Sequence, residues 1–211
     1  HIQSIDIATA IHKRKTVWKT EKGNVTVMCE RFASMADQHI IGMKYIVVTD
    51  FDTDIEIVTG IDGDVWDING PHFCNVQPEI KDNCECVTGV TGEKNISVTV
   101  RQCVNPGFDC VKSEYSDDFS VYKKMTFNAA AGKEYYFTKI AFAETSVDDF
   151  ECKNTNIDYE SAKSEHIKAW RKIWEMSYIK IDGDEEAERD INYSIYHLNC
   201  IAPRNMKDKS L

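Results

Sequence analysis

Short runs in which apolar and polar residues alternate are the feature of this sequence that most restricts its fold. Between Asp54 and Thr59, Ile55 and Ile57 fall on one side of an extended chain, and Asp54 and Glu56 fall on the other. A period of two residues predicts a half-buried strand. The same pattern predicts strands over Asn24–Phe32, Gly42–Thr49, Asp54–Thr59, Cys84–Val90, Ile96–Cys103, Val121–Phe127 and Glu134–Ala143.

Turn signals separate these runs, with little helix between them. They are Glu21–Asn24, Asp62–Asp64, Thr91–Lys94 and Ala131–Lys133. Many short alternating strands joined by tight turns are typical of an antiparallel β-sandwich rather than a parallel sheet. We therefore expect a mainly β fold, with the sandwich domain spanning residues 1–155.

Beyond residue 155 the pattern becomes helical. From Asp158 to Tyr178 the apolar side chains form one stripe at helical spacing, made of Ile167, Trp170, Trp174 and Tyr178. We expect this stripe to pack on the sandwich or on the next helix, and we assign residues 156–183 to a helical linker.

A second helix is predicted to begin near Asp184, and we assign residues 184–211 to the unit that contains it. Asp182-Gly183-Asp184-Glu185 offers a carboxylate to the free amides at its start, and Pro203 ends it. Its apolar stripe is Ala187, Ile191, Ile195, Leu198 and Ala202. Because no partner helices follow, we expect Ile195 and Leu198 to be partly exposed or covered by another copy of the chain.

The charge of the chain limits its partners. The formal net charge is -10 and the sequence pI is about 5.1. Such a surface repels phosphate backbones and anionic lipid, so we expect no nucleic-acid and no membrane partner. The basic cluster near the N-terminus follows the short apolar stretch, the reverse of a signal peptide. Either the protein stays inside the cell or its N-terminus has been cut away, and we expect a cytoplasmic protein.

The eight cysteines are predicted to be free, buried thiols, because the chain is long and carries no export signal. They are Cys29, Cys74, Cys84, Cys86, Cys103, Cys110, Cys152 and Cys200. Three glycosylation sequons begin at Asn24, Asn95 and Asn192. Asn192 falls in a predicted helix, so the three sequons are interpreted as chance.

Two groups of side chains resemble metal sites. Asp50, Asp52, Asp54 and Glu56 resemble the start of a calcium loop, but Ile55 and Ile61 stand where that loop needs Gly and Glu. The spacings of a possible zinc set also differ from the usual knuckles. That set is His72, Cys74, Cys84 and Cys86. We expect neither metal.

One segment, Gly60–Phe73, could contact a sugar. It combines a tight turn with Trp66, Asn69 and His72, and an aromatic face can stack on a pyranose ring. The alternative places Trp66 in the core and leaves the other residues to shape the turn. The turn residues are explained without a ligand, so we favour the core position for Trp66. No nucleophile motif and no phosphate-binding loop accompany this segment.

Several motifs in a fixed order resemble glycoside hydrolase family 65, which includes maltose, kojibiose and trehalose phosphorylases. The stretch from Glu30 to His39 is similar to the family's E-R-F-x-S-M-A-x-x-H pattern. The other matching segments are Ile57–Asp67, the H-x₃-W-x₃-W pattern of His166, Trp170 and Trp174, Ile179–Asp184, Ile195–Pro203 and Asn205–Leu211.

The resemblance implies a large β-sandwich, a helical linker and an (α/α)₆ barrel. The barrel would supply the catalytic Glu and the phosphate site, so no catalytic residue is assigned in this chain. Residues 184–211 would be the first helix of that barrel. The family's first strands would precede His1, so we expect the sandwich to be incomplete.

The resemblance further implies inverting phosphorolysis of an α-linked glucose disaccharide by the whole enzyme. Inorganic phosphate would be a substrate, and no metal or other cofactor is implied. We expect this chain to be a non-catalytic module that supports the barrel and a homodimer. A free-standing carbohydrate-binding module is the alternative, and a complete small enzyme is a third.

Overall fold

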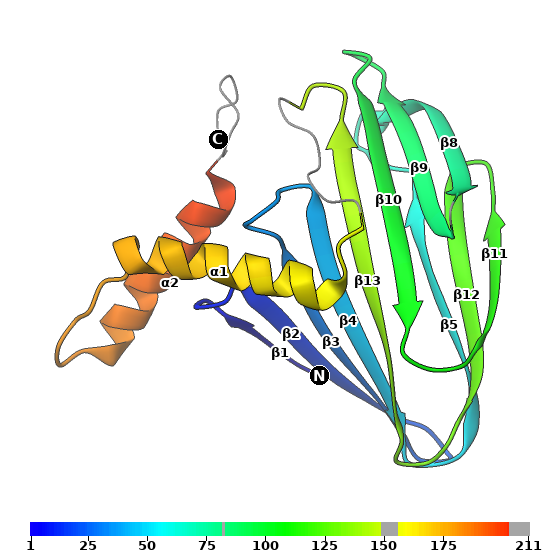
Figure 1. The fold of residues 1–211 in the computed structure, drawn as a ribbon, viewed down its shortest axis with the longest axis horizontal. Helices are drawn as coiled ribbons and strands as arrows, with labels where there is room; N and C mark the ends of the chain where they lie inside the picture. The colour runs from blue at the N-terminus through cyan, green and yellow to red at the C-terminus, as the bar shows by residue number, and fades with distance from the viewer. Residues whose placement is uncertain (82, 149–155, 203–211) are drawn as a thin grey trace.

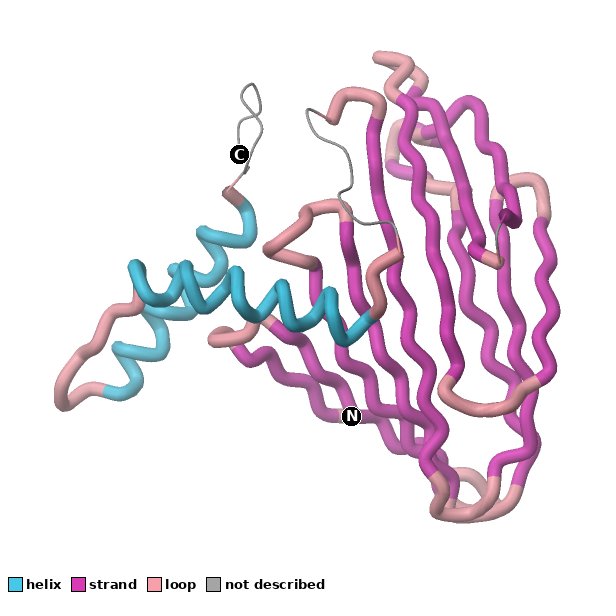
Figure 2. Tube along the Cα trace, viewed as in Figure 1, coloured by secondary structure: helices cyan, strands magenta, loops and turns pink. Residues whose placement is uncertain are grey.

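The computed structural model describes residues 1–81, 83–148 and 156–202. Within these ranges the chain forms two β-sheets, a short hairpin and two helices (Figures 1 and 2). The strands are β1 (Ile2–Asp6), β2 (Ile11–Lys19), β3 (Asn24–Ala33), β4 (Ile40–Thr49), β5 (Thr53–Asp62), β6 (Trp66–Asp67), β7 (Gly70–Pro71), β8 (Phe73–Lys81), β9 (Cys84–Thr91), β10 (Ser97–Pro106), β11 (Val111–Ser116), β12 (Ser120–Ala129) and β13 (Glu134–Thr145). The helices are α1 (Tyr159–Ser177) and α2 (Glu185–Ile201).

The two sheets differ in size. The large sheet has eight antiparallel strands in the order β1-β2-β3-β4-β13-β10-β9-β8, and the small sheet has three in the order β11-β12-β5. The small sheet packs over β8, β9 and β10. The predicted mainly β sandwich followed by two helices is therefore confirmed.

Strand β13, near the middle of the large sheet, is buried on both faces. Tyr135 and Phe137 point toward the small sheet, where they pack with the side chains of Phe127 and Met125. Ile140 and Phe142 belong to the opposite face and pack beneath α1. Successive side chains of a strand point to opposite faces. The buried positions are odd-numbered where the small sheet covers one face and even-numbered where α1 covers the other, and the change falls between Phe137 and Ile140.

Both helices begin where the sequence predicts. The carboxylate of Asp158 accepts hydrogen bonds from the amides of Glu160 and Ser161 at 2.9 and 3.0 Å, and that of Asp184 accepts one from Ala187 at 2.9 Å. These bonds satisfy amides that the first helical turn leaves free. Helix α2 ends at Ile201. The predicted stop at Pro203, the domain boundary at residue 155 and the segment Asn205–Leu211 lie outside the described residues.

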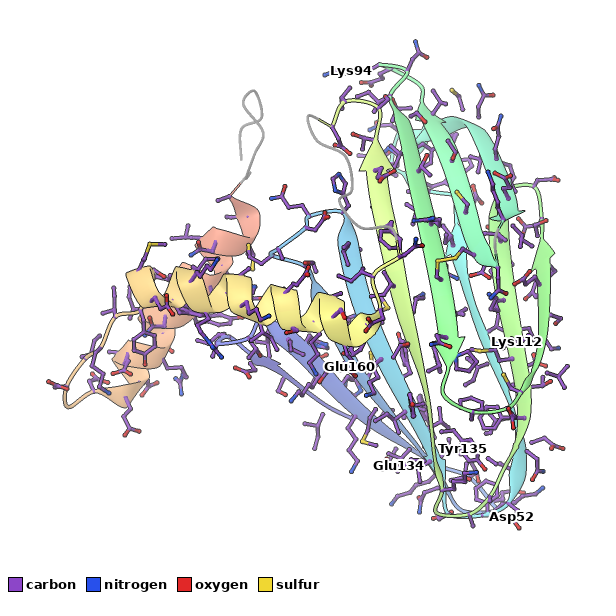
Figure 3. The ribbon with its side chains drawn as sticks, in the orientation of Figure 1. Asp52, Lys94, Lys112, Glu134, Tyr135 and Glu160 are labelled. Atoms are coloured by element: carbon purple, nitrogen blue, oxygen red, sulfur yellow. A yellow bond between two sulfur atoms is a disulfide. The ribbon has the colours of Figure 1, made fainter. Side chains whose placement is uncertain are left out.

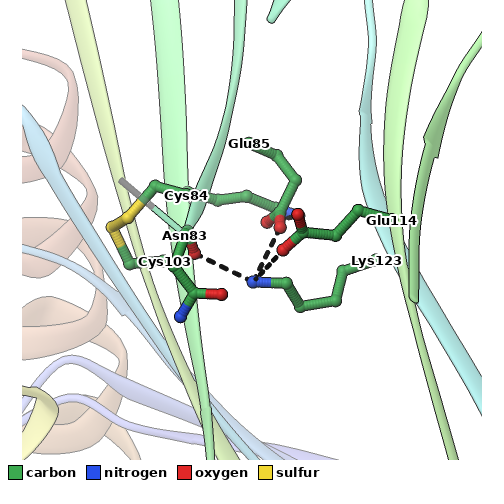
Figure 4. Close-up of a disulfide and its surroundings, with 7 residues drawn as sticks. Asn83, Cys84, Glu85, Cys103, Glu114 and Lys123 are labelled. Atoms are coloured by element: carbon green, nitrogen blue, oxygen red, sulfur yellow. Dashed lines mark hydrogen bonds and ion pairs between the residues drawn. A yellow bond between two sulfur atoms is a disulfide. The ribbon is translucent and has the colours of Figure 1, made fainter. Parts of the chain in front are cut away.

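A polar network crosses the interior of the sandwich. The ammonium group of Lys123, on the small sheet, lies 2.8 Å from the carboxylate of Glu85 and 3.1 Å from that of Glu114 (Figure 4). It also donates to the carbonyl of Asn83 at 2.9 Å. Lys123 and Glu85 are both fully buried, so each charge depends on the other for compensation.

The network continues through Gln102. Its amide donates to Glu85 at 3.1 Å and its oxygen accepts from Lys139 at 3.0 Å. Lys139 also donates to Thr59 at 3.0 Å. Burial lowers the pKa of Lys139 and the negative charge of Glu85 partly opposes that shift. The network thus joins strands of both sheets.

The prediction that all cysteines are free is wrong. Cys84 and Cys103 form a disulfide between β9 and β10 (Figure 4). The register sets Gln102 opposite Glu85, so the next residues outward, Cys103 and Cys84, also face each other, with Cα atoms 4.6 Å apart. Cys29 is a buried free thiol as predicted, whereas Cys74, Cys86, Cys110 and Cys200 are free but exposed or half-buried. Cys152 lies outside the described residues.

Neither α1 nor α2 combines the length and the apolar character needed to cross a membrane, and no other helix occurs in the described ranges.

Candidate functional site

The segment from Gly60 to Phe73 leaves the sandwich as a separate hairpin. Asp62 accepts hydrogen bonds from the amide of Asp64 at 2.9 Å and from the hydroxyl of Ser120 at 3.0 Å, which turns the chain away from β5. Strands β6 and β7 then pair Trp66 with Pro71. Pro71 has no amide hydrogen to donate, but the pairing does not stop there, because the amide of His72 donates to the carbonyl of Val65 at 2.9 Å.

The tip of this hairpin is a two-residue turn. The amide of Asn69 donates to the carboxylate of Asp67 at 2.6 Å, and Gly70 has a φ of 115°. That backbone region strongly favours glycine. Ile68, at the tip, is completely exposed.

Trp66 does not occupy the core. Its side chain is 63% exposed, and its indole N–H donates to the carboxylate of Asp64. The physical reason is that β6 and β7 have two residues each, pair only with each other among the described strands, and leave most of their side chains exposed. The favoured core position for Trp66 is therefore wrong.

Asn69 and His72 do line a common hollow of about 450 Å³ between the hairpin and the β9–β10 turn. His72 lies 3.4 Å from the carboxylate of Asp67, and Lys94 approaches from the other wall. Figure 3 places Lys94 at one end of the sandwich, opposite the end marked by Asp52. Trp66 is not among the lining residues, so the structure gathers two of the three predicted sugar contacts.

The residues considered as metal ligands have other roles. Asp50 accepts two hydrogen bonds from Asn24, both of 2.7 Å, and Asp52 accepts one from the amide of Ala131 at 2.8 Å. Cys84 of the possible zinc set is consumed by its disulfide. Over residues 1–81, 83–148 and 156–202, no three His, Cys, Asp or Glu side chains gather as metal ligands would.

The second candidate site is the junction where α1 crosses the outer face of the large sheet. Phe32 stacks on the His166 ring with centroids 4.7 Å apart and also contacts the ring of Tyr159. The Phe32 ring lies against Gly42, where an added Cβ would come within 2.4 Å of it. Only glycine leaves room for this aromatic group between sheet and helix.

A half-buried acid ties α1 to β3. The carboxylate of Glu30 accepts hydrogen bonds from the hydroxyl of Tyr159 and the ammonium group of Lys163. Burial alone would raise the pKa of Glu30, but these two bonds hold it below its ordinary value. Burial, followed by the bond to Glu30, raises the pKa of Tyr159, so both groups keep the ionisation states that the contact needs.

The loop after β3 is shaped by its own side chains. The hydroxyl of Ser34 accepts from the amides of Ala36 and Asp37, each at 3.2 Å. His39 lies 2.9 Å from Asp37 and 3.6 Å from Asp148, which follows β13. The motif between Glu30 and His39 therefore holds α1 and the turn that follows β13.

The helices are joined by aromatic and amide contacts. Trp170 is buried between Trp174 and Tyr196, with ring centroids 5.9 and 5.3 Å away. Trp174 donates to the carbonyl of Ile7 at 2.9 Å, in the β1–β2 turn. The predicted packing of the aromatic stripe on the sandwich or on the second helix is confirmed for Trp170 and Trp174, whereas Tyr178 is 53% exposed.

The connection between the helices depends on two α2 residues. Asn192 accepts from the amide of Ile179 at 3.0 Å and donates to its carbonyl at 2.8 Å, so its buried side chain is unavailable to a glycan. Hydrogen bonds from Tyr178, the amide of Ile181 and Lys180 lower the pKa of Glu188 to about 2. Sequence reasoning missed this role of Asn192. The position of this polar residue on the buried side of α2 was the signal that could have indicated a structural role.

The outer side of α2 remains open in the described structure. Leu198 is exposed and Ile195 is half-buried, as predicted. Ile191, Tyr193 and Ile201 are also exposed.

Comparison with known proteins places this architecture in a family. The family model described as "Glycosyl hydrolase family 65, N-terminal domain" matches residues 1–173. The nigerose phosphorylase of Lachnoclostridium phytofermentans is 32% identical over 100% of this chain and 32% of its own length. The 1,2-alpha-glucosylglycerol phosphorylase of Bacillus selenitireducens is 27% identical over 95% of this chain and 28% of its own length.

A solved structure shares the fold. It is a human-microbiome protein, provisionally described as a kojibiose phosphorylase, and it covers 93% of this chain with a TM-score of 0.83 at 16% identity. The match covers 28% of that protein. The chain thus spans about a third of the curated relatives that it matches, and it belongs to glycosyl hydrolase family 65, as part of the N-terminal domain.

Proposed function

We propose that this chain is a non-catalytic N-terminal region of an α-glucoside phosphorylase, in which it supports the catalytic barrel and the assembly of the enzyme. The observation that carries this proposal is the use of the family motif. The side chains of this motif contact α1 or shape the loop beside it. They are Glu30, Phe32, Ser34 and His39. Side chains in buried structural contacts are poorly placed to meet a substrate.

The exposed apolar side of α2 supports the same proposal. Ile191, Leu198 and Ile201 form an apolar surface that water does not favour. A helical layer of the remaining polypeptide would cover it. In this proposal α1 is the linker and α2 is the first helix of an (α/α)₆ barrel.

The proposed reaction of the whole enzyme is inverting phosphorolysis of an α-linked glucose disaccharide. A protonated carboxylic acid of the barrel donates to the glycosidic oxygen, while inorganic phosphate attacks the anomeric carbon from the opposite face. The partners proposed for the whole enzyme are the disaccharide, phosphate and a second subunit, in the cytoplasm. Nucleic acid, membrane and resident cofactors have no part in it.

The test is a phosphorolysis assay on the 211-residue chain. The chain is incubated with inorganic phosphate and, separately, with nigerose, kojibiose, maltose and trehalose. We expect no glucose 1-phosphate above a mock preparation, while an intact nigerose phosphorylase gives product from nigerose. Release of glucose 1-phosphate by the chain alone would overturn the non-catalytic role.

A second candidate function is carbohydrate binding at the β6–β7 hairpin. The exposure of Trp66 favours it, since the ring is free to stack on a pyranose. Asn69 and His72 would supply polar contacts from the adjacent hollow. Titration calorimetry with maltose, kojibiose and glucose tests this candidate.

The matched control for that titration is Trp18, another exposed tryptophan on a different part of the surface. Heat that disappears in Trp66→Ala and persists in Trp18→Ala would establish the hairpin as a sugar site. No heat in the unaltered chain would remove this candidate and leave the supporting role.

A further inference from the structure

A basic hollow lies on the outer face of the large sheet, beside the first half of α1. Helix α1 crosses β3 and β4, and these strands run on past the helix (Figure 1). The hollow has a volume of about 440 Å³ and is lined by residues of β1 to β4 and of α1. Four ammonium groups surround it, and among the described lining residues the only carboxylate is that of Glu30. The four are Lys13, Lys15, Lys44 and Lys163.

The register of the strands explains why these side chains meet. Two rows of directly opposed residues cross β2, β3 and β4. The first row is Lys13, Glu30 and Lys44, and the second is Lys15, Met28 and Ile46. Opposed residues of neighbouring strands point to the same face, so both rows reach the side of the sheet on which α1 lies. The sheet thus supplies three of the ammonium groups and an apolar floor, and α1 supplies the fourth.

Two of the four lysines are already held in place. The ammonium group of Lys44 lies 3.3 Å from the carboxylate of Glu160 and 5.2 Å from the centroid of the Tyr136 ring. The ammonium group of Lys163 donates to Glu30. Groups that are positioned before a ligand arrives reduce the entropy cost of binding it.

The other two lysines have unused charge. Lys13 and Lys15 are exposed, and neither forms an ion pair or a side-chain hydrogen bond with another residue in the described parts of the chain. Burial raises the pKa of Glu30, whereas Lys163, Tyr159 and then Lys13 lower it, so the charge of Lys13 acts within the hollow. One carboxylate cannot neutralise four ammonium groups. The hollow therefore keeps an excess of positive charge in a chain whose net charge is -10.

The chemistry of the lining selects a class of ligand. An ammonium group is a compact charge with three donors and can meet the oxygens of a phosphate group from several directions. The volume falls within the range of about 300–1,000 Å³ that is typical of small-molecule sites, which a phosphate group alone would not fill. Half-buried Met28 and Ile46 offer apolar contact to the rest of such a ligand.

We propose that this hollow binds a phosphomonoester. Its phosphate group meets Lys13, Lys15 and Lys163, and its organic body, of the size of a sugar or a nucleoside, lies against Met28 and Ile46. An acidic peptide suits the hollow less well, because its charges are spread along an extended chain. A ligand that contacts β2 and α1 together also stabilises their junction, so binding should raise the melting temperature.

The test is titration calorimetry on the 211-residue chain. At about 10 mM salt, where the Debye length is about 30 Å, the chain is titrated with glucose 1-phosphate, AMP, inorganic phosphate and glucose. We expect one site that binds at least one of the two esters about tenfold or more tightly than inorganic phosphate, because the organic body buries apolar surface. Glucose should not bind there, and the preferred ester identifies the body that the hollow accepts.

A pair of double variants locates the site. Lys13→Gln/Lys15→Gln should weaken binding of the preferred ester at least about tenfold, since it removes two charge-assisted contacts. Its melting temperature without ligand should stay within a few degrees of the parent, because both side chains are exposed. Lys168→Gln/Lys172→Gln is the matched control. It removes the same charge from exposed positions of α1 and should change the affinity by less than about twofold.

Several outcomes would overturn the proposal. The unaltered chain could bind neither ester, or it could bind inorganic phosphate equally well, which would show an adventitious anion only. Equal weakening in the two double variants would mean that net charge, rather than the hollow, attracts the ester. A polyglutamate peptide that binds more tightly than both esters would identify an acidic segment as the occupant. The phosphorolysis assay is independent of all these outcomes, so failure here leaves the proposed function standing.

Discussion

The imidazole of His166 accepts a hydrogen bond of 3.0 Å from the backbone amide of Met35, across 131 positions of sequence. His166 lies on α1, is fully buried and stacks on Phe32. One side chain thus fixes both the helix and the loop that receives it.

Replacing His166 should therefore weaken the junction. His166→Ala removes a buried ring and leaves the amide of Met35 without its partner. We expect a loss of about 2–4 kcal/mol in the free energy of unfolding, measured by urea titration. His72→Ala, at an exposed histidine, should change it by less than about 0.5 kcal/mol. Equal effects of the two substitutions would contradict a structural role for His166.

Burial also makes the stability of the junction depend on pH. It lowers the pKa of His166 below 6.5, so the unfolded chain takes up a proton at a higher pH than the folded one. The contribution is fully present above about pH 6.5 and is lost as pH falls through the folded pKa. Urea midpoints should fall between about pH 7.5 and pH 5.5, and fall less in His166→Ala, which keeps the lowered pKa of His12 but loses that of His166. Parallel pH profiles for the two proteins would refute the assignment.

The disulfide gives a redox-dependent stability. It joins Cys84 and Cys103, which are 19 residues apart, and closing a loop of that size contributes about 3 kcal/mol. The double variant Cys84→Ser/Cys103→Ser should melt several degrees lower, and dithiothreitol should lower the melting temperature of the unaltered chain but not of the variant. Cys74→Ser is the control, because Cys74 is an exposed free thiol. A melting temperature that does not respond to reductant would show that the bond adds nothing.

The buried ion pair predicts a large single-site effect. Lys123→Met leaves Glu85 charged and uncompensated inside the sandwich, which should cost about 3–5 kcal/mol. Lys123→Met/Glu85→Leu removes both charges and should recover part of that loss in a double-mutant cycle. Lys124→Met changes an exposed pair with Glu56 and should cost less than about 1 kcal/mol. A double variant no more stable than Lys123→Met would show that the pair is not the source.

The exposure of Trp66 predicts that its removal has little effect on the stability of the protein. A core tryptophan would cost about 3–5 kcal/mol on truncation to alanine. Because Trp66 is exposed and contacts Asp64 only locally, Trp66→Ala should change the free energy of unfolding by less than about 1 kcal/mol. Thermal melts of the two proteins decide between the values.

The sequence was sufficient to predict a strand where one face of that strand is exposed to solvent and the other is buried. Ile55 and Ile57 point inward and Asp54 and Glu56 outward in β5, as the alternation predicts. Strands β2 and β11 escaped prediction because that contrast is missing. β2 carries His12, Lys13, Arg14 and Lys15 in succession, and β11 is exposed throughout. A strand without a hydrophobic face has no period to detect.

The disulfide and the place of Trp66 could not be predicted for a different reason. Both depend on which strands become neighbours. Cys84 meets Cys103 because β9 pairs with β10 in one register, and a shift of one residue would send the two thiols to opposite faces. Trp66 is exposed because β6 and β7 pair only with each other. The pattern of neighbouring residues in the sequence does not determine which distant strands pair or in which register.

Strand β13 has a consequence for how such proteins can be recombined. Its Ile140 and Phe142 are covered by α1, while Tyr135 and Phe137 are covered by the small sheet. A sandwich transplanted without α1 would expose Ile140 and Phe142, together with Phe32 beside them. An inherited or engineered swap of this domain between relatives must therefore carry α1 with it, so the natural seam for exchange lies between the two helices.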